Sequence, residues 1–420
     1  MSVAGNHNYD AIIIGTGVAG LSTAMQLAAR GKRVLALDRR GITSGATRQA
    51  SGLLGQMRST VASTRLLMDS IRTLLEIEKL LGQQVYRQTG SIRVAQTPER
   101  AAELRGHVEV ARAAGLKVEL IDRARAAELM PYLRTDDLLE IAWCPEDGYL
   151  NPPELAALYR QACKATAVHL RDFCPVTEIL VSGGSVQGVV AGGETFRAPV
   201  VVNASGAWSY LVADLAKQPL PTAGIGHYYF TLAPVAEHPV DAKSPTLRDR
   251  ENLIYSRPAA GGLRVGIYEL KPDQYDMESL PADFEMSSLV PKADHPSVVE
   301  LIEKSAVRFP FVRPDLPMTL HTGIMSFTPD GDPLLGEFAG IGGLYHCAGF
   351  GGHGVVQSPA IGLATAELIL DGTWRYNPDD LEADRFFDMP QMRDRATVKA
   401  RCAQVYADYY GKVSLPPAKR

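Results

Sequence analysis

Three glycines near the N-terminus have the spacing Gly15-Thr-Gly17-Val-Ala-Gly20, which is suited to holding phosphate groups. In such a turn Gly15 allows a tight bend, Gly17 lets a pyrophosphate approach the backbone, and Gly20 lets the following helix lie close to a sheet. The N-terminus of that helix also supplies free N–H groups and the positive end of its dipole. The spacing therefore predicts a dinucleotide-binding site, with a purely structural glycine turn as the alternative.

The elements that must position this turn surround it in the sequence. The apolar run 11–14 is long enough for a strand buried on both faces, and the stretch 21–30 has helix-forming residues. A second apolar strand, 33–37, ends on Asp38, whose carboxylate could hydrogen-bond both hydroxyls of an adenosine ribose. This context favours the dinucleotide over the structural alternative.

Stretches of small residues return along the chain, at 44–52, 203–208 and 343–354. A backbone without bulky side chains lets a ligand lie against it. Between them, from about 221 to 320, the sequence becomes locally aromatic, and alternation at 262–268 indicates antiparallel strands that could form the floor of a pocket. For any single tyrosine here, the core of a mixed sheet is an equally good interpretation.

Composition excludes several other classes of function. The formal net charge of -4 and the isoelectric point near 6.2 give no basic surface for nucleic acid. The five cysteines show no CxxC spacing and indicate reduced thiols, and the nine histidines show no metal-ligand pattern. The polar segment 1–8 and the short apolar run after it form neither a signal peptide nor a transmembrane segment, so we expect a cytoplasmic protein.

These stretches resemble the glycine/D-amino acid oxidase (DAO) superfamily of FAD-dependent oxidoreductases. Within it the sequence is most similar to the dimethylglycine/sarcosine dehydrogenase and sarcosine oxidase branch. A tail at 398–412 also resembles the segment that leads those dehydrogenases into a folate-binding domain, which we expect this chain to lack. The motifs that carry the resemblance are Ile14–Gly20, Ser44–Gly52, Thr89–Ala95, Asn203–Trp208, His227–Tyr229, Leu247–Asp249, Gly266–Glu269, Thr328–Asp330 and Ala348–Gly354.

The resemblance implies an α/β fold in which a Rossmann-like FAD-binding domain is assembled from separated segments. We expect this domain to comprise 1–85, 147–221 and 321–385. A substrate-binding domain with a mixed or antiparallel sheet is expected at 86–146 and 222–320, followed by a C-terminal helix and tail at 386–420.

The resemblance also implies which residues bind FAD. They are Gly15, Gly17, Val18, Ala19, Gly20, Asp38, Arg39, Ala46, Thr47, Gln49, Ala50, Ser51, Gly52, Val176, Ala204, Ser205, Gly206, Trp208, Gly323, Asp330, Gly349, Phe350, Gly351, Gly352, His353 and Gly354. The dehydrogenases carry their covalent flavin link on a histidine at the place of Gln49, and the sarcosine oxidases carry theirs on a cysteine near Gly323. Neither nucleophile is present, so we predict FAD that is bound without a covalent link.

The implied reaction is oxidation of a C–N bond in a secondary or tertiary amine, such as an N-methyl or N-alkyl amino acid, by hydride transfer to flavin N5 and hydrolysis of the imine. His227, Tyr255 and Tyr268 are candidates for the base that deprotonates the amine, with structural roles as the alternative. His353 is expected beside the flavin or substrate, or as a capping residue. Arg48 and Arg58 could pair with a substrate anion, or Arg48 could lie along the flavin ring, with surface salt bridges as the alternative for both.

Other functions stay open on the same scaffold. One is oxidation of glycine, D-amino acids or 2-hydroxy acids, and another is a flavoprotein subunit of a multi-subunit amine or opine oxidase. A nicotinamide dehydrogenase fits the first motif only. The lysine that sarcosine oxidases use for oxygen activation is replaced by Val356, which argues against an oxidase. The sequence alone leaves both O2 and an electron carrier open as the acceptor.

Overall fold

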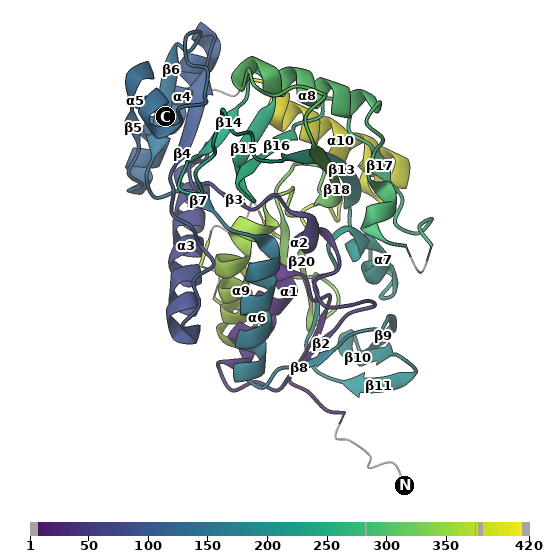
Figure 1. Cartoon of the computed structure of the whole chain (residues 1–420). Helices are drawn as coiled ribbons and strands as arrows, with labels where there is room; N and C mark the ends of the chain where they lie inside the picture. The colour runs from purple at the N-terminus through teal and green to yellow at the C-terminus, as the bar shows by residue number, and fades with distance from the viewer. Residues whose placement is uncertain (1–6, 282–283, 374, 377–380, 414–420) are drawn as a thin grey trace.

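In the computed structural model, which describes residues 7–281, 284–373, 375–376 and 381–413, the chain folds around two large β-sheets (Figure 1). The first sheet lies with helices α1, α6 and α9 in the lower half of Figure 1, and the second lies beneath α8 in the upper half. The mixed α/β class predicted from the sequence, with parallel and antiparallel sheets, is confirmed.

The first sheet has six strands and contains the glycine turn. Five strands run parallel, and the edge strand β19 runs antiparallel to its neighbour. Their spatial order is β19 (Leu334–Glu337), β20 (Leu344–Ala348), β12 (Val201–Asn203), β1 (Ala11–Ile14), β2 (Val34–Leu37) and β8 (His169–Arg171). The strands come from three distant parts of the chain, and the five parallel strands end on the same side, where a ligand of a doubly wound sheet binds.

Both faces of the first sheet are covered, as its continuous apolar strands require. Ala11 and Ile13 pack into the helical layer, whereas Ile12 and Ile14 face the other way. The helical layer consists of α1 (Val18–Ala28), α3 (Val61–Leu81), α6 (Pro152–Ala165) and α9 (Gly354–Asp371). The opposite face is covered by a small antiparallel sheet of β9 (Val176–Ser182), β10 (Ser185–Ala191) and β11 (Glu194–Arg197).

The second sheet has nine strands and is antiparallel except for one pair, β4 and β14. Its order is β17 (Gln274–Tyr275), β13 (Ala223–Leu232), β16 (Gly262–Ile267), β15 (Ile254–Ala259), β14 (Thr246–Asp249), β4 (Ser91–Ala95), β6 (Glu140–Cys144) and β5 (Glu119–Leu120), with β18 (Met318–Phe327) paired along β13. Helices α4 (Pro98–Ala114), α5 (Arg123–Leu129) and α8 (Pro296–Arg308) accompany it.

Strand β18 runs across the boundary that the sequence predicted at 320/321. It pairs with β13 from Met318 to Phe327, so the second sheet extends further along the chain than the aromatic composition indicated. The domain limits themselves stay a prediction.

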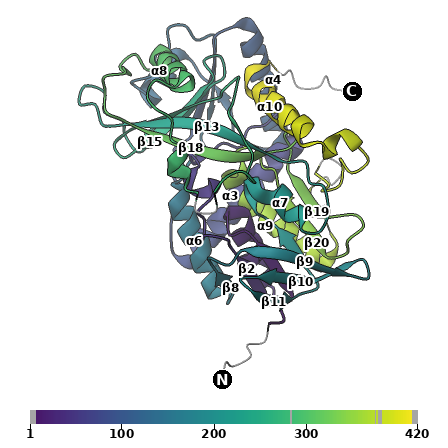
Figure 2. The ribbon, with the colours of Figure 1, turned by 90° about the vertical axis from the view of Figure 1, so that its right-hand side faces the viewer.

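The remaining elements connect the two sheets or line the space between them. They are α2 (Ala46–Gln49), β3 (Leu53–Leu54), which pairs with β7 (Gly148–Tyr149), the short helices at Gly206–Trp208, Met286–Leu289 and Pro390–Arg393, α7 (Ser209–Asp214) and α10 (Arg395–Gly411). Figure 2 shows α10 beside the second sheet, where it contacts β13 and β18. Among the described residues, no helix combines the length and apolar character needed to cross a bilayer.

Candidate active site

The turn between β1 and α1 is built around glycines that have no room for a side chain. Gly15 has a φ of +102°, and a Cβ on it would lie 2.5 Å from the carbonyl oxygen of Ala204. A Cβ on Gly20 would lie 2.0 Å from the carbonyl oxygen of Gly15, so this glycine lets α1 pack against the turn. The turn therefore has the close packing that a phosphate-binding glycine motif requires.

A cavity opens beside this turn at the ends of β1 and β2; we call it the Asp38 cavity. Asp38 Oδ2 accepts hydrogen bonds from Thr16 N at 2.9 Å and Thr16 Oγ1 at 2.6 Å, and Oδ1 accepts one from Arg40 N at 3.0 Å. The guanidinium of Arg39 lies over the ring of Trp208 at 4.6 Å. The predicted cofactor residues that line this cavity include Gly15, Asp38, Arg39, Val176, Ser205 and Trp208.

A second cavity continues from the first into the space between the two sheets; we call it the His227 cavity. Gly17, Ala46, Thr47, Ala204, Gly206 and Ala207 line both cavities. Val18, Ala19, Gln49, Ala50, Ser51, Gly52, Gly323, Phe350, Gly352, His353 and Gly354 also line the second cavity, together with His227, Tyr255 and Tyr268. The structure thus brings the three small-residue stretches and four of the candidate catalytic residues, His227, Tyr255, Tyr268 and His353, to one elongated site.

The residues of this site fit a flavin dinucleotide. At Gly17 a Cβ would lie 3.3 Å from Thr47 Oγ1, and at Gly352 it would lie 2.8 Å from Met325 Sδ, so the backbone lies bare along the cavity wall. Trp208 Nε1 is buried in the Asp38 cavity without a hydrogen-bond partner and is available to a ligand. In this motif the acidic residue binds the ribose of the dinucleotide, and the helix N-terminus binds its pyrophosphate. Asp38 and the N-terminus of α1 lie where these two contacts are expected.

The wall of the His227 cavity opposite the glycine motifs carries a hydrogen-bonded network. His227 Nδ1 donates to Glu269 Oε2 at 3.1 Å, and His227 Nε2 accepts from the hydroxyl of Tyr255 at 2.7 Å. The proton is placed on Nδ1 because an ionised carboxylate only accepts hydrogen bonds. Tyr406 donates its hydroxyl to the same oxygen of Glu269, and Tyr228 N–H donates to the other at 2.7 Å. Glu269, which is buried, therefore fixes both the tautomer and the orientation of His227.

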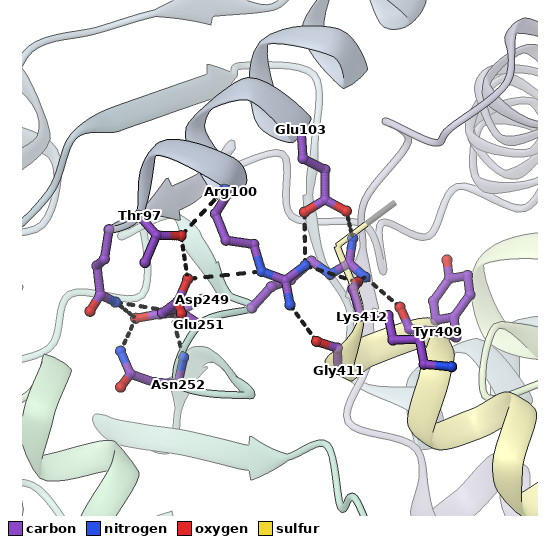
Figure 3. A network of polar contacts seen from close by, with 11 residues as sticks. Thr97, Arg100, Glu103, Asp249, Glu251, Asn252, Tyr409, Gly411 and Lys412 are labelled. Carbon is purple, nitrogen blue, oxygen red and sulfur yellow. Dashed lines mark hydrogen bonds and ion pairs between the residues drawn. The ribbon is translucent and has the colours of Figure 1, made fainter. Parts of the chain in front are cut away.

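Tyr406 and Tyr410 come from α10, so the C-terminal helix completes the cavity wall. Figure 3 shows how the end of this helix is held: Arg100 donates to the carbonyl oxygens of Gly411 and Lys412 at 2.7 and 3.0 Å. Glu103 bridges Arg100 at 2.8 Å and Arg250 at 2.7 Å, and Arg250 in turn donates to Tyr409 O. This network fastens α10 to the second sheet and to α4.

Helix α9 points its N-terminus into the cavity. His353 is its N-cap residue, and the backbone N–H groups of its first turn are free of intrahelical partners. Burial, and then the charges of Arg58, Arg248 and Arg93, hold the pKa of His353 well below its usual range, so its imidazole is neutral. The helix dipole therefore supplies the positive potential here without a charged histidine.

Gln49 and Gly323, the two positions considered above for a covalent flavin link, lie next to each other in the cavity wall. A Cβ on Gly323 would lie 3.1 Å from Gln49 Cβ. The hydroxyl of Tyr229 donates to Gln49 O at 2.9 Å. Val356, at the place of the oxygen-activating lysine, also lines this cavity and is buried.

Some predicted residues lie outside both cavities. Arg48 is exposed on α2, because its neighbour Thr47 is the residue that this short helix turns inward. Asp330 is exposed and is bound by Arg385 at 2.8 Å, so it caps a surface turn and contacts neither cavity.

Gly20, Gly349 and Gly351 have packing roles: a Cβ on Gly349 would lie 2.3 Å from Thr328 Cγ2, and one on Gly351 would lie 3.1 Å from Gly331 O.

Sequence reasoning missed the partners that surround His227. In the sequence, Glu269 and Arg248 stand out only as members of the motifs that carry the family resemblance. Tyr406 and Tyr410 lie in the tail at 398–412, for which no role in the site was predicted. The signal available for Glu269 was a carboxylate at the end of an apolar strand, and for the two tyrosines it was their i, i+4 spacing on one helix face. Neither signal shows what the residues face, because Glu269 is 42 positions from His227, and Tyr406 is 137 positions from Glu269 and 179 from His227.

Fold and site together define a protein with a glycine-turn dinucleotide motif on a parallel α/β sheet, and with a cavity that continues from this turn to a mixed sheet. The sequence profile of the FAD-dependent oxidoreductase family, DAO, matches residues 10–368, and the chain belongs to this family. Its cofactor is accordingly FAD.

Individual relatives agree with this assignment. Mitochondrial dimethylglycine dehydrogenase from Rattus norvegicus is 26% identical over 387 residues, which cover 90% of this chain and 45% of the relative. Glycine oxidase from Geobacillus kaustophilus is 28% identical over 377 residues, covering 86% and 93% of the two chains. The crystal structure of L-proline dehydrogenase from P. horikoshii shares the fold, with a TM-score of 0.81 at 24% identity over 90% of this chain and 98% of that one. The chain spans about half the length of the dimethylglycine dehydrogenase that it matches.

Proposed function

We propose that the protein uses FAD to oxidise a C–N bond in a secondary or tertiary amine of the N-alkyl amino acid type. The observation that carries this proposal is one continuous cavity, which joins the glycine-lined cofactor site to a wall of His227, Tyr255 and Tyr268. The match to dimethylglycine dehydrogenase, whose name states an N-methylated substrate, supports the choice of amine. FAD supplies the hydride-accepting ring, and the chain must orient the amine and take up its proton.

The network around His227 is suited to that proton transfer. An amine reacts with flavin as the free base, so a bound ammonium group must first lose a proton. Nε2 of His227 is the available acceptor, either directly or through the hydroxyl of Tyr255 that it already binds at 2.7 Å. Burial raises the pKa of Tyr255 well above its usual range, so this phenol stays protonated and acts as a donor to Nε2.

The other walls serve binding and charge stabilisation. Residues 50–52 and 323–326 line the cavity with small or flexible groups, which leaves space for an alkyl substituent on the amine. The N-terminus of α9 faces the same cavity, and its N–H groups favour negative charge on the reduced cofactor.

An anaerobic substrate screen tests the proposal. N-methyl and N-alkyl amino acids are expected to bleach the flavin absorbance, whereas 2-hydroxy acids such as lactate leave it unchanged. Absence of bleaching by every amine would overturn the proposal. Admitting air to the reduced protein then identifies the acceptor: slow return of the yellow colour, with fast return on adding an electron carrier, indicates a dehydrogenase or a partner subunit rather than an oxidase.

Oxidation of glycine or another primary amino acid is the second candidate. It is favoured by the glycine oxidase relative, because this chain spans 93% of that protein. Bleaching by glycine or D-alanine, with N-alkyl amines inert, would support this candidate over the first.

We also propose that FAD is held without a covalent link. The amide of Gln49 and the missing side chain of Gly323 leave no histidine or cysteine at the two linking positions of relatives. Acid precipitation is expected to release all the yellow colour into the supernatant. Flavin that stays on the polypeptide would contradict this prediction and direct attention to Cys347, which also lines the cavity.

A further inference from the structure

Three arginines cluster beside the His227 cavity, and one of them, Arg248, lines it. Arg248 and Arg93 are register partners on the parallel strands β14 and β4, so they stand side by side on one face of the second sheet. A Cβ on Gly55 would lie 3.6 Å from Arg93 Nη2 and 3.8 Å from Arg248 Cζ. Arg58 joins them, because Arg58 Nη1 and Arg93 Nη2 both donate to Met57 O, at 2.9 and 2.7 Å.

These guanidinium groups have unused hydrogen-bond donors. Arg248 lines the cavity, and its guanidinium makes no hydrogen bond or ion pair with any described residue. Arg58 Nη2 and Arg93 Nε are buried without a partner. None of the three arginines is within ion-pair distance of a carboxylate in the part of the chain that the structure describes.

The carboxylate beside the cluster does not balance it. Asp147 is fully buried and lies 3.5 Å from the same Gly55 Cβ position. Its oxygens already accept hydrogen bonds from Gln56 N at 2.9 Å and Ser91 Oγ at 2.6 Å. One carboxylate beside three guanidinium groups leaves an excess of two positive charges.

Neighbouring groups add hydrogen-bond donors but no negative charge. The rings of Tyr268 and Tyr410 stack at 3.8 Å and line the cavity beside Arg248. Neither hydroxyl has a hydrogen-bond partner among the described residues. Burial and the adjacent arginines lower the pKa of His107 to about 4 and hold the pKa of His353 well below its usual range, so both histidines are neutral.

A cluster of unpaired charges costs free energy unless a ligand neutralises it. The planar guanidinium group matches a carboxylate with two parallel hydrogen bonds. We propose that the substrate is a dicarboxylate amine, such as an N-(carboxyalkyl) amino acid. One carboxylate binds to Arg248 and the tyrosine hydroxyls, and the charge of the second is balanced by Arg93 and Arg58. This inference rests on the proposed amine oxidation and narrows its substrate class.

Binding of unreactive analogues to the FAD-loaded protein tests the inference. Diglycolate has two carboxylates and an ether oxygen in place of the amine, and methoxyacetate is the matched compound with one carboxylate. Binding is followed by the change in flavin absorbance and by melting temperature. Diglycolate is expected to bind at least about 10-fold more tightly, because it adds charge-assisted hydrogen bonds. Equal affinities for the two acids would overturn the inference.

Variants assign the binding to the arginines. Arg248→Gln and Arg93→Gln are expected to weaken diglycolate binding by about 10- to 100-fold. Arg264→Gln, on β16 of the same sheet but outside the cavity, is the matched control and should bind diglycolate like the unaltered protein. Arg248→Lys, which keeps the charge, should retain part of the affinity. Diglycolate binding that is unchanged in both glutamine variants would overturn the inference.

Melting temperatures separate binding from a structural role. Without ligand, Arg93→Gln is expected to melt at the same temperature as the unaltered protein or higher, because it removes repulsion between like charges. A lower melting temperature with unchanged diglycolate affinity would show that Arg93 is structural and would overturn its part in the site. Tight diglycolate binding combined with no flavin reduction by any amine would support the dianion site and overturn the proposed amine oxidation instead.

Discussion

Replacing Gly15 by alanine is expected to produce a protein that has largely lost FAD. The backbone at Gly15 is left-handed, with φ of +102°, and the new Cβ would lie 2.5 Å from Ala204 O and 2.8 Å from Ala204 C. Backbone strain costs about 1–2 kcal/mol and overpacking about 1–3 kcal/mol. To relieve this strain and overlap, the β1–α1 turn must move away from Ala204 at the end of β12. That movement displaces the N-terminus of α1 from the expected position of the pyrophosphate.

The expected weakening is large enough to measure directly. A cost of about 2–5 kcal/mol that falls on the FAD-binding conformation raises the dissociation constant of FAD by about 30-fold or more. The ratio of flavin absorbance at 450 nm to protein absorbance reports occupancy, and flavin fluorescence quenching gives the dissociation constant.

Gly31→Ala is the matched control. Gly31 is also left-handed, with φ of +80°, but a Cβ on it would have no atom within 4 Å. This variant is expected to lose about 1 kcal/mol of unfolding free energy and to keep its FAD. If Gly15→Ala retains flavin as well as Gly31→Ala does, the close approach to Ala204 does not control the cofactor site.

Replacing His227 by glutamine is expected to lower the rate constant of flavin reduction by about 100- to 10,000-fold, the usual contribution of a general base. Glutamine keeps a polar side chain of similar length between Tyr255 and Glu269 but accepts no proton. FAD content and substrate affinity should change little, because the loss falls on proton transfer. Anaerobic stopped-flow measurement at several amine concentrations separates the rate constant from the dissociation constant.

Glu269 is expected to act through His227 rather than on the substrate. It holds Nδ1 at 3.1 Å and is itself fixed by Tyr406 and by Tyr228 N–H, and it does not line the cavity. Glu269→Gln should therefore slow flavin reduction at unchanged substrate affinity, with partial recovery in Glu269→Asp.

His321→Gln is the control for the His227 variant. His321 lies on the neighbouring strand β18, stacks on Tyr229 at 4.6 Å and lies outside the cavity, so its loss should leave the reduction rate unchanged. A His227 variant that reduces its flavin at the normal rate would show that the amine loses its proton elsewhere.

The cofactor half of the site could be predicted from the sequence because it depends on local patterns. Gly15 and Gly17 have their roles fixed by the strand before them and the helix after them, and Asp38 follows one strand later. Each of these relations spans fewer than about 30 residues and follows from backbone conformation and hydrogen bonding. The small-residue stretches at 44–52 and 203–208 were found for the same reason: absence of side chains is visible in the sequence itself.

The substrate half depends on contacts between distant residues, and these only the tertiary structure decided. His227 meets Tyr406 from a helix that begins at Arg395, and Arg93 meets Arg248 through a parallel strand pair that no alternation pattern predicts. In the sequence, Arg48 and Arg58 were equivalent candidates for pairing with a substrate anion, but the fold exposes Arg48 and places Arg58 in the buried cluster. The sequence thus determined the glycine turn and the aspartate after the next strand, since backbone geometry is local. Which charges lie at the His227 cavity was decided by packing, because burial depends on elements far apart in the chain.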